Sequence, residues 1–306
     1  MMFIFPLSAT LVSLIFSVLV FRQYLQKHRP YQLAWSAALF MFGIGSLAET
    51  LATFGSWNEL LVKTYYLFGG TLVVGYLGLG TLYVSGDFEA GGRIATFLLG
   101  RRFNTLLSVS LTFFLWSMIY GLQMSKVNGA LAGAIALLYV AVLFAAIVAK
   151  EKVPVVYLVV LLIASALAAY AIWQGHIDSA KLTELKGWHA LNRTPPIKTG
   201  AFSLNVVGSF LLIIGAIQSA VGLLRKHIMR ERAIGNILIA AGVLVVAGGG
   251  TLGGLFGLGG QAAISGPMAV GVTIMFLGFL ETGRPSAPPT GKAGESAPRK
   301  TSRVRA

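Results

Sequence analysis

The sequence predicts an all-α polytopic membrane protein, a transmembrane helical bundle of about nine spans, with seven or eight spans as alternatives. Hydrophobic residues make up 56% of its 306 positions and charged residues only 11%, whereas a soluble domain carries about 25% charged residues. The apolar runs are about 20 residues long, the length that a helical span needs. In hydrocarbon the backbone must satisfy its own hydrogen bonds, and helices of this length do so.

Two basic octets divide the apolar runs. The first runs from Arg22 to Arg29 and reads RQYLQKHR; the second runs from Arg225 to Arg232 and reads RKHIMRER. Each octet is flanked by apolar runs and is too charged to lie in hydrocarbon. We therefore expect each to form a hairpin on one side of the membrane and to set the topology of the spans around it.

The expected spans are the apolar runs between charged segments. They lie at about 2–21, 31–54, 64–84, 104–122, 130–149, 153–173, 200–223, 233–250 and 262–281. Residues 248–260 form either a span end with a loop or a re-entrant segment. Residues 1–283 thus make up the membrane bundle, and the basic tail 284–306, rich in Pro and Ser, is expected to be disordered.

The distribution of Lys and Arg favours one orientation. With both octets in the cytoplasm, 18 of the 24 basic residues fall on that side, the tail included. Because cytoplasmic loops carry the excess of Lys and Arg, we expect a bacterial cytoplasmic membrane protein with its N-terminus outside and its C-terminus inside. The net charge of +14 is then explained by the Lys and Arg residues that set the orientation of the spans. We expect no nucleic-acid binding, because no basic soluble domain is available for it.

The octets also indicate an internal repeat. At their offset of 203 residues, two Ala–Ala pairs align, and Gly45 aligns with Gly248. Residues 1–84 and 200–283 then become parallel three-span units, joined by the spans within 104–173, a plan used by several transporters. Any two basic hairpins look alike to some degree, so duplication and chance both stay open.

Glycines are concentrated in two expected spans. The stretch AGGGTLGGLFGLGG places Gly249, Gly253 and Gly257 four residues apart, and small residues at this spacing let helix backbones approach closely in lipid. We predict helix packing there, and not a dinucleotide site, since no strand precedes the glycines. A second cluster is expected to pack the third span in the same way. It comprises Gly69, Gly70, Gly75, Gly78 and Gly80.

Glu49 is the one carboxylate that lies clearly within an expected span. An ionisable group inside a membrane is a candidate for function. Its position near the outer interface also allows a structural alternative, in which Glu49 reaches water or pairs with Lys63. All four His residues lie outside the expected spans, so we expect no membrane haem, and the sequence predicts no cofactor.

The long loop at 174–199 has features of its own. Asp178 is expected to cap a short helix that lays an apolar face on the membrane surface. His176, Asp178 and His189 could bind a metal, although their spacing matches no familiar site. Pro195 and Pro196 are expected to break the helix before the seventh span.

Four segments resemble those of a group of uncharacterised bacterial multi-pass membrane proteins. They are HRPYQLAWSAALF at 28–40, YYLFGG at 65–70, LGLGTLYV at 77–84 and GNILIAAGVLVVAGGGTL at 235–252. More distantly, the first four spans resemble the membrane input region of some histidine kinases, but the short tail leaves no place for a kinase domain. The resemblance implies a helical membrane fold and carries over no functional residues.

The sequence as a whole favours a protein without intrinsic catalysis, namely an accessory, scaffold or sensor-like subunit of a membrane assembly. Its expected partners are the bilayer, other membrane subunits, and anionic lipid at the basic tail. The alternative is a small-molecule or lipid transporter with a site between the two three-span units.

Overall fold

The computed structural model describes residues 3–84, 153–183, 187–226, 234–235, 237–246 and 262–282. Within these ranges the chain is helical and has no β-strand, only an isolated bridge between Ile177 and Leu191. Outside the described residues lie the expected spans at 104–122 and 130–149, the segment 248–260 and the tail 284–306.

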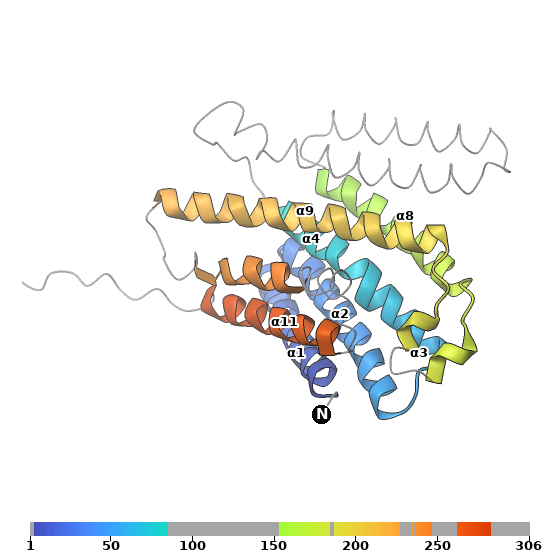
Figure 1. Cartoon of the computed structure of the whole chain (residues 1–306). Helices are drawn as coiled ribbons and strands as arrows, with labels where there is room; N and C mark the ends of the chain where they lie inside the picture. The colour runs from blue at the N-terminus through green and yellow to red at the C-terminus, as the bar shows by residue number, and fades with distance from the viewer. Residues whose placement is uncertain are drawn as a thin grey trace, which may run out of the picture.

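Five helical stretches are long and apolar enough to cross a membrane, which indicates a membrane-embedded protein. They are α1 (Ile4–Lys27), α2 (Pro30–Phe54), a composite helix over Glu59–Val84, α8 (Val153–Trp173), and α9 (Pro195–Lys226) in its first part. The composite helix consists of α3 (Glu59–Thr64), the π-helix η1 (Tyr65–Leu72) and α4 (Val73–Val84). Shorter apolar helical stretches are Ile237–Val246 and Ser265–Glu281, the latter within α11 (Ala262–Thr282). The all-helical prediction is confirmed for the described residues (Figure 1).

The first octet is mostly helix, not the loop that its charge suggests. The first span was expected to end near residue 21, but α1 continues through Lys27, because Arg, Gln and Lys are good helix formers and remain exposed here. The turn itself is confined to His28, which has a left-handed backbone (φ 49°), and to Arg29, which is extended before Pro30 starts α2. Arg22, in the last two turns of α1, and Arg29, in the turn itself, are both exposed.

The second octet is described only at its start. Arg225 belongs to the last turn of α9, and Arg232 lies outside the described residues. Its predicted hairpin therefore stays a prediction.

Two further helices start earlier than expected. The third span begins at Glu59 and not at 64, because the Asn58 side-chain oxygen accepts a hydrogen bond from the Leu61 N–H (2.9 Å) and caps α3. The seventh span was expected to start at about residue 200, after a helix break at Pro195 and Pro196, but α9 already starts at Pro195. Both belong to the first turn of α9, where a proline's missing N–H costs little.

Helices α1 and α2 form a close antiparallel hairpin whose contact is lined by small hydroxyl side chains. The Ser17 hydroxyl donates to the Ser36 carbonyl (2.8 Å), and the Thr10 and Thr50 hydroxyls lie 3.3 Å apart. Small residues bring helix backbones together, and their hydroxyl groups hydrogen-bond locally or across the interface. Helix α2 then packs on η1 and α4, α4 packs on α9 and α8, and α1 packs on α11.

The glycines of the composite helix lie at these contacts. A Cβ added at Gly78 would lie 2.9 Å from Cα of Gly208 in α9, and one added at Gly80 would lie 2.2 Å from the Trp35 ring of α2. Gly75 is similarly close to α8. The predicted packing role of this cluster is confirmed except at Gly70, where an added Cβ would meet no atom within 4 Å.

Candidate functional site

The π-helix η1 interrupts the third span. Segments of this kind are rare and occur frequently at functional sites, and they displace carbonyls from the regular α-helical pattern. The Thr71 hydroxyl donates to the Tyr66 carbonyl, five residues earlier (2.8 Å). The Asn205 side chain of α9 donates to the Gly70 carbonyl (2.8 Å) and to the Ala201 carbonyl of its own helix (2.8 Å). Because a bare carbonyl is costly in lipid, Asn205 supports the irregular backbone of η1 from the neighbouring helix.

Helix α2 meets η1 at a direct backbone contact. A Cβ added at Gly45 would lie 2.5 Å from Cα of Gly69, closer than real Cβ atoms approach. Position 45 therefore has no room for a side chain, and η1 and α2 are in direct backbone contact here.

Glu49 lies one turn beyond Gly45 on α2 and is only 3% exposed. Its carboxyl is within electrostatic range of the Tyr65 hydroxyl at the start of η1. The expectation that Glu49 reaches water is wrong, because its side chain is buried. The ion pair that the structure gives Lys63 is with Glu59. Glu49 thus belongs to the packed contact between α2 and η1, and its candidacy for a functional role stays a hypothesis.

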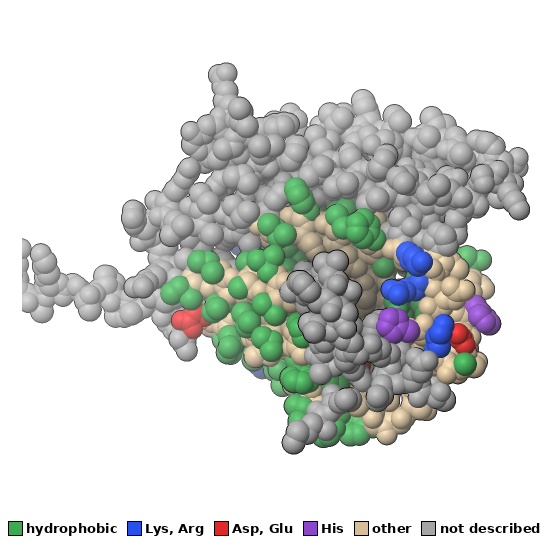
Figure 2. All heavy atoms as spheres, viewed as in Figure 1, with side chains coloured by type: hydrophobic (Ala, Val, Ile, Leu, Met, Phe, Trp, Pro, Cys, Tyr) green, Lys and Arg blue, Asp and Glu red, His purple; other side chains and the backbone are tan. Residues whose placement is uncertain are grey.

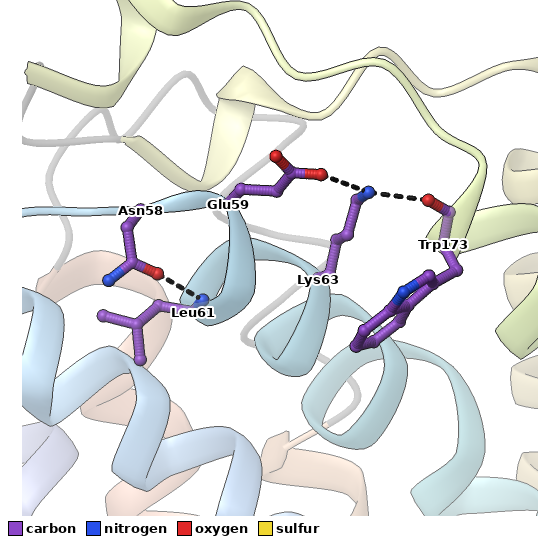
Figure 3. A network of polar contacts seen from close by, with 5 residues as sticks. All are labelled: Asn58, Glu59, Leu61, Lys63 and Trp173. Atoms are coloured by element: carbon purple, nitrogen blue, oxygen red, sulfur yellow. Dashed lines mark hydrogen bonds and ion pairs between the residues drawn. The ribbon is translucent and has the colours of Figure 1, made fainter.

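Lys63 is a buried cation that joins two distant helices (Figure 3). It is 5% exposed, and its ammonium lies 2.6 Å from Glu59 Oε1 and 2.6 Å from the Trp173 carbonyl oxygen at the end of α8. The same ammonium lies 5.8 Å from the Trp173 ring centroid. A buried charge is tolerated only when it is paired and hydrogen-bonded, and these contacts meet that requirement.

The α8–α9 loop (residues 174–194) folds back on itself next to α3 (Figure 1). The Asp178 N–H donates to the Ala190 carbonyl (2.8 Å), and the Asn192 N–H donates to the His176 carbonyl (2.9 Å). Asp178 also accepts from the Ala180 N–H (3.2 Å), so it caps a short helix as predicted. That helix, η2 (Ser179–Thr183), is a 3₁₀ turn followed by a second one, η3 (Gly187–Ala190). The apolar face expected of this short helix includes Leu185, which lies outside the described residues, so that part stays a prediction.

Gly187 seats the loop on Trp57, in the short connection between α2 and the third span. A Cβ at this position would lie 2.3 Å from the Trp57 ring, which is itself buried. The Trp57 ring then contacts the Tyr65 ring edge to face, with centroids 5.7 Å apart. A continuous row of contacts thus leads from the loop to the first residue of η1.

The loop and the first turn of α9 line a half-open cavity of about 430 Å³, here called the loop cavity. Its lining includes Lys181, Arg193, Lys198, His176 and His189, and Asp178 is its one carboxylate among the described residues. In Figure 2 the basic and His side chains of the visible face gather over this loop, whereas hydrophobic side chains cover much of the remaining coloured surface. The cavity is therefore polar and predominantly basic.

Arg193 connects the loop cavity to η1. It lies close enough to act electrostatically on the Tyr66 hydroxyl, and that hydroxyl is buried without a hydrogen-bond partner among the described residues. A buried polar group without a protein partner calls for a water or another ligand.

The predicted site residues are only partly brought together. Glu49 lies beside η1, Arg22 lies near the end of α1 and Arg29 in the α1–α2 turn. Gly249, Gly253 and Gly257 lie outside the described residues. The described residues hold no group of three or more His, Asp or Glu side chains placed to bind a metal, so His176, Asp178 and His189 do not form the metal site considered above. Sequence reasoning missed the π-helix and the loop cavity. The tandem aromatics and glycines of YYLFGG were the available signal for the first.

The chain was compared with family models, curated proteins and solved structures. No family model, curated protein or solved structure matches the chain. The site is therefore interpreted from its own geometry.

Proposed function

We propose that the protein is a sensor-like or accessory subunit of a membrane assembly, without intrinsic catalysis. The observation that carries this proposal is the seating of the α8–α9 loop on the third span, through Gly187 and Trp57 and through the Lys63–Trp173 bond. From there, contacts continue through Tyr65 to the π-helix and to α2. Such an arrangement suits a protein in which a change at the loop alters the packing of its spans.

The proposed topology has nine spans in a bacterial cytoplasmic membrane, with the N-terminus outside and the C-terminus in the cytoplasm. The α8–α9 loop is then on the outer side, where solutes are met, and Arg22 and Arg29 are on the cytoplasmic side. The proposal is supported by the exposure of Arg22 near the end of α1 and of Arg29 in the turn that follows, and by the bias of Lys and Arg. The resemblance to the input region of histidine kinases stays part of this proposal.

The proposed repeat of 1–84 and 200–283 has support in the packing. Under the octet offset, α1 corresponds to α9, and the composite helix to α11. Helix α1 packs on α11, and α9 packs on α4, so each first helix packs on the third helix of the other unit. Both units also contain a close glycine contact between their second and third helices. These are Gly45 with Gly69, and Gly242 with Gly271.

The transporter alternative needs a substrate site between the two three-span units. The described part of the contact between these units argues against such a site. A Cβ at Gly208 would lie 2.2 Å from the Val74 carbonyl oxygen, and Gly78 is equally close-packed on α9. Backbone-to-backbone contact leaves no space for a substrate at that depth. We therefore favour the sensor-like function.

Purification from native membranes tests the proposed function. The tagged full chain is extracted in mild detergent beside an unrelated tagged multi-pass protein as control, and the co-purifying chains are identified by mass spectrometry. A partner chain recovered in a fixed ratio with this protein, and absent from the control, is the expected result. Recovery of the chain alone overturns the accessory function.

A further inference from the structure

The loop cavity carries an excess of positive charge. Among the described residues, its one acidic lining residue is Asp178, which is already paired with Lys181 at 3.0 Å. Arg193 and Lys198 have no ion-pair partner among the described residues, and His176 and His189 add two further nitrogen-bearing rings. Two cations thus face a cavity of about 430 Å³ without a described carboxylate of their own.

The local electrostatics already favour a negative group in this cavity. The hydrogen bond and charge of Lys181, with a smaller contribution from His176, hold the pKa of the Asp178 carboxyl below its ordinary value. Lys198 lies in the first turn of α9, a helix of 32 residues. The positive end of the dipole of α9 therefore points toward the same cavity. Each of these effects stabilises an anion more than a neutral or cationic ligand.

We propose that the loop cavity binds a small oxyanion, a phosphate or carboxylate group, through Arg193 and Lys198. The planar guanidinium of Arg matches two oxygens of such a group, and the Lys ammonium adds a point charge. A volume of about 430 Å³ is in the range of small-molecule sites. Through Arg193 the anion would act on the unpartnered Tyr66 hydroxyl and thus on η1. The biological meaning of this site rests on the proposed sensor-like function, but the binding itself does not.

The two sources of such a group are a free solute and the headgroup of an anionic lipid, and both present the same phosphate chemistry. The full chain in detergent is titrated calorimetrically with inorganic phosphate and with citrate, at an ionic strength matched with sodium chloride. The titration is repeated in nanodiscs of phosphatidylcholine with and without phosphatidylglycerol. A phosphate affinity that phosphatidylglycerol lowers identifies the headgroup as occupant, and an unchanged affinity identifies the free anion. Both support the site.

Substitutions assign the binding to named residues. Arg193→Gln and Lys198→Gln should each weaken phosphate binding about tenfold or more, because each removes a charge-assisted hydrogen bond. Arg193→Lys should keep part of the affinity. Arg22→Gln, which removes an exposed charge near the end of α1 and outside the cavity lining, should leave it unchanged. Unfolding midpoints measured without phosphate confirm that each variant is folded.

Three results overturn the proposed site. They are an absence of binding beyond that of chloride, a wild-type affinity in Arg193→Gln and Lys198→Gln, and an equal loss in Arg22→Gln. A chain that purifies alone but binds phosphate refutes the accessory function and leaves the site intact. A chain that purifies with a partner but binds no anion refutes the anion site and leaves the accessory function intact.

Discussion

The Lys63 ammonium donates a hydrogen bond to the Trp173 carbonyl oxygen, 2.6 Å away, although the two residues are 110 positions apart. The last carbonyls of a helix have no partner within the helix, and Trp173 ends α8. Lys63 thus caps α8 from another span, where its positive charge also complements the helix dipole. This bond fixes the point at which the α8–α9 loop leaves the bundle.

Lys63→Met tests the contribution of this cap to stability. Met retains the aliphatic length of Lys but leaves the Trp173 carbonyl without a donor, so we expect a loss of about 1–3 kcal/mol in the free energy of unfolding. Lys181→Met is the matched control, because its ion pair with Asp178 is exposed and exposed pairs contribute about 0–1 kcal/mol. Chemical unfolding in detergent measures both variants. Equal losses would show that Lys63 is no more than a surface charge.

Gly45→Ala tests the contact between α2 and η1. The added Cβ would lie 2.5 Å from Cα of Gly69, and forcing the helices apart should cost about 1–3 kcal/mol, more than the gain in helix propensity returns. At Gly69 an added Cβ would be in ordinary contact at 3.5 Å, and at Gly70 it would meet nothing within 4 Å. Gly69→Ala and Gly70→Ala should therefore be tolerated in the same unfolding measurement. A Gly70→Ala variant as unstable as Gly45→Ala would refute the packing account.

Glu49→Gln and Glu49→Ala separate the shape of this side chain from its charge. Gln has nearly the same size and still accepts hydrogen bonds, so the unfolding midpoint should stay close to that of the native chain. Ala leaves a gap and removes the polar contacts of a buried group, and a loss of about 1–3 kcal/mol is expected. If Gln is as damaging as Ala, the fold itself needs the carboxyl. If only Ala is damaging, Glu49→Gln becomes a clean probe of the functional hypothesis in the native-membrane purification.

The Asp178–Lys181 pair predicts a weak dependence of stability on pH. Because folding lowers the pKa of Asp178, its contribution is fully present above the unfolded pKa of about 3.9. It is lost as the pH falls from there through the lowered folded value. The difference in unfolding midpoint between the native chain and Asp178→Asn should be constant near pH 7 and shrink below about pH 4. A difference in unfolding midpoint that grows on acidification would contradict the predicted direction of this pH dependence.

The sequence was sufficient for the features that depend on average composition and on small-residue spacing. Run length and the scarcity of charge predicted the helical membrane class, and the glycines at 75, 78 and 80 were correctly assigned to packing. Element ends were less predictable, because a basic octet reads as a loop although its residues are good helix formers in α1. Prolines 195 and 196 read as an interruption although they begin α9.

The site itself depends on contacts between segments far apart in the chain. Nothing local distinguishes Lys63 from an orientation-setting lysine, since its partner is a backbone carbonyl of residue 173. The expectation that Glu49 reaches water was wrong for a related reason: the register of α2 against η1, set by the contact of Gly45 with Gly69, decides what the carboxyl faces. The loop cavity likewise arises only when residues 176–181 and 189–198 fold against each other.

The most direct test of the link between the α8–α9 loop and the third span is hydrogen–deuterium exchange on the Gly187→Ala variant. Its added Cβ would meet the Trp57 ring at 2.3 Å, so the loop must lift. Gly266→Ala, which meets no atom within 4 Å, is the control. Because Trp57 contacts Tyr65, we predict faster amide exchange in Gly187→Ala both in the loop and in residues 65–72. Faster exchange confined to the loop, with residues 65–72 as protected as in the control, would contradict the link between the loop and the third span.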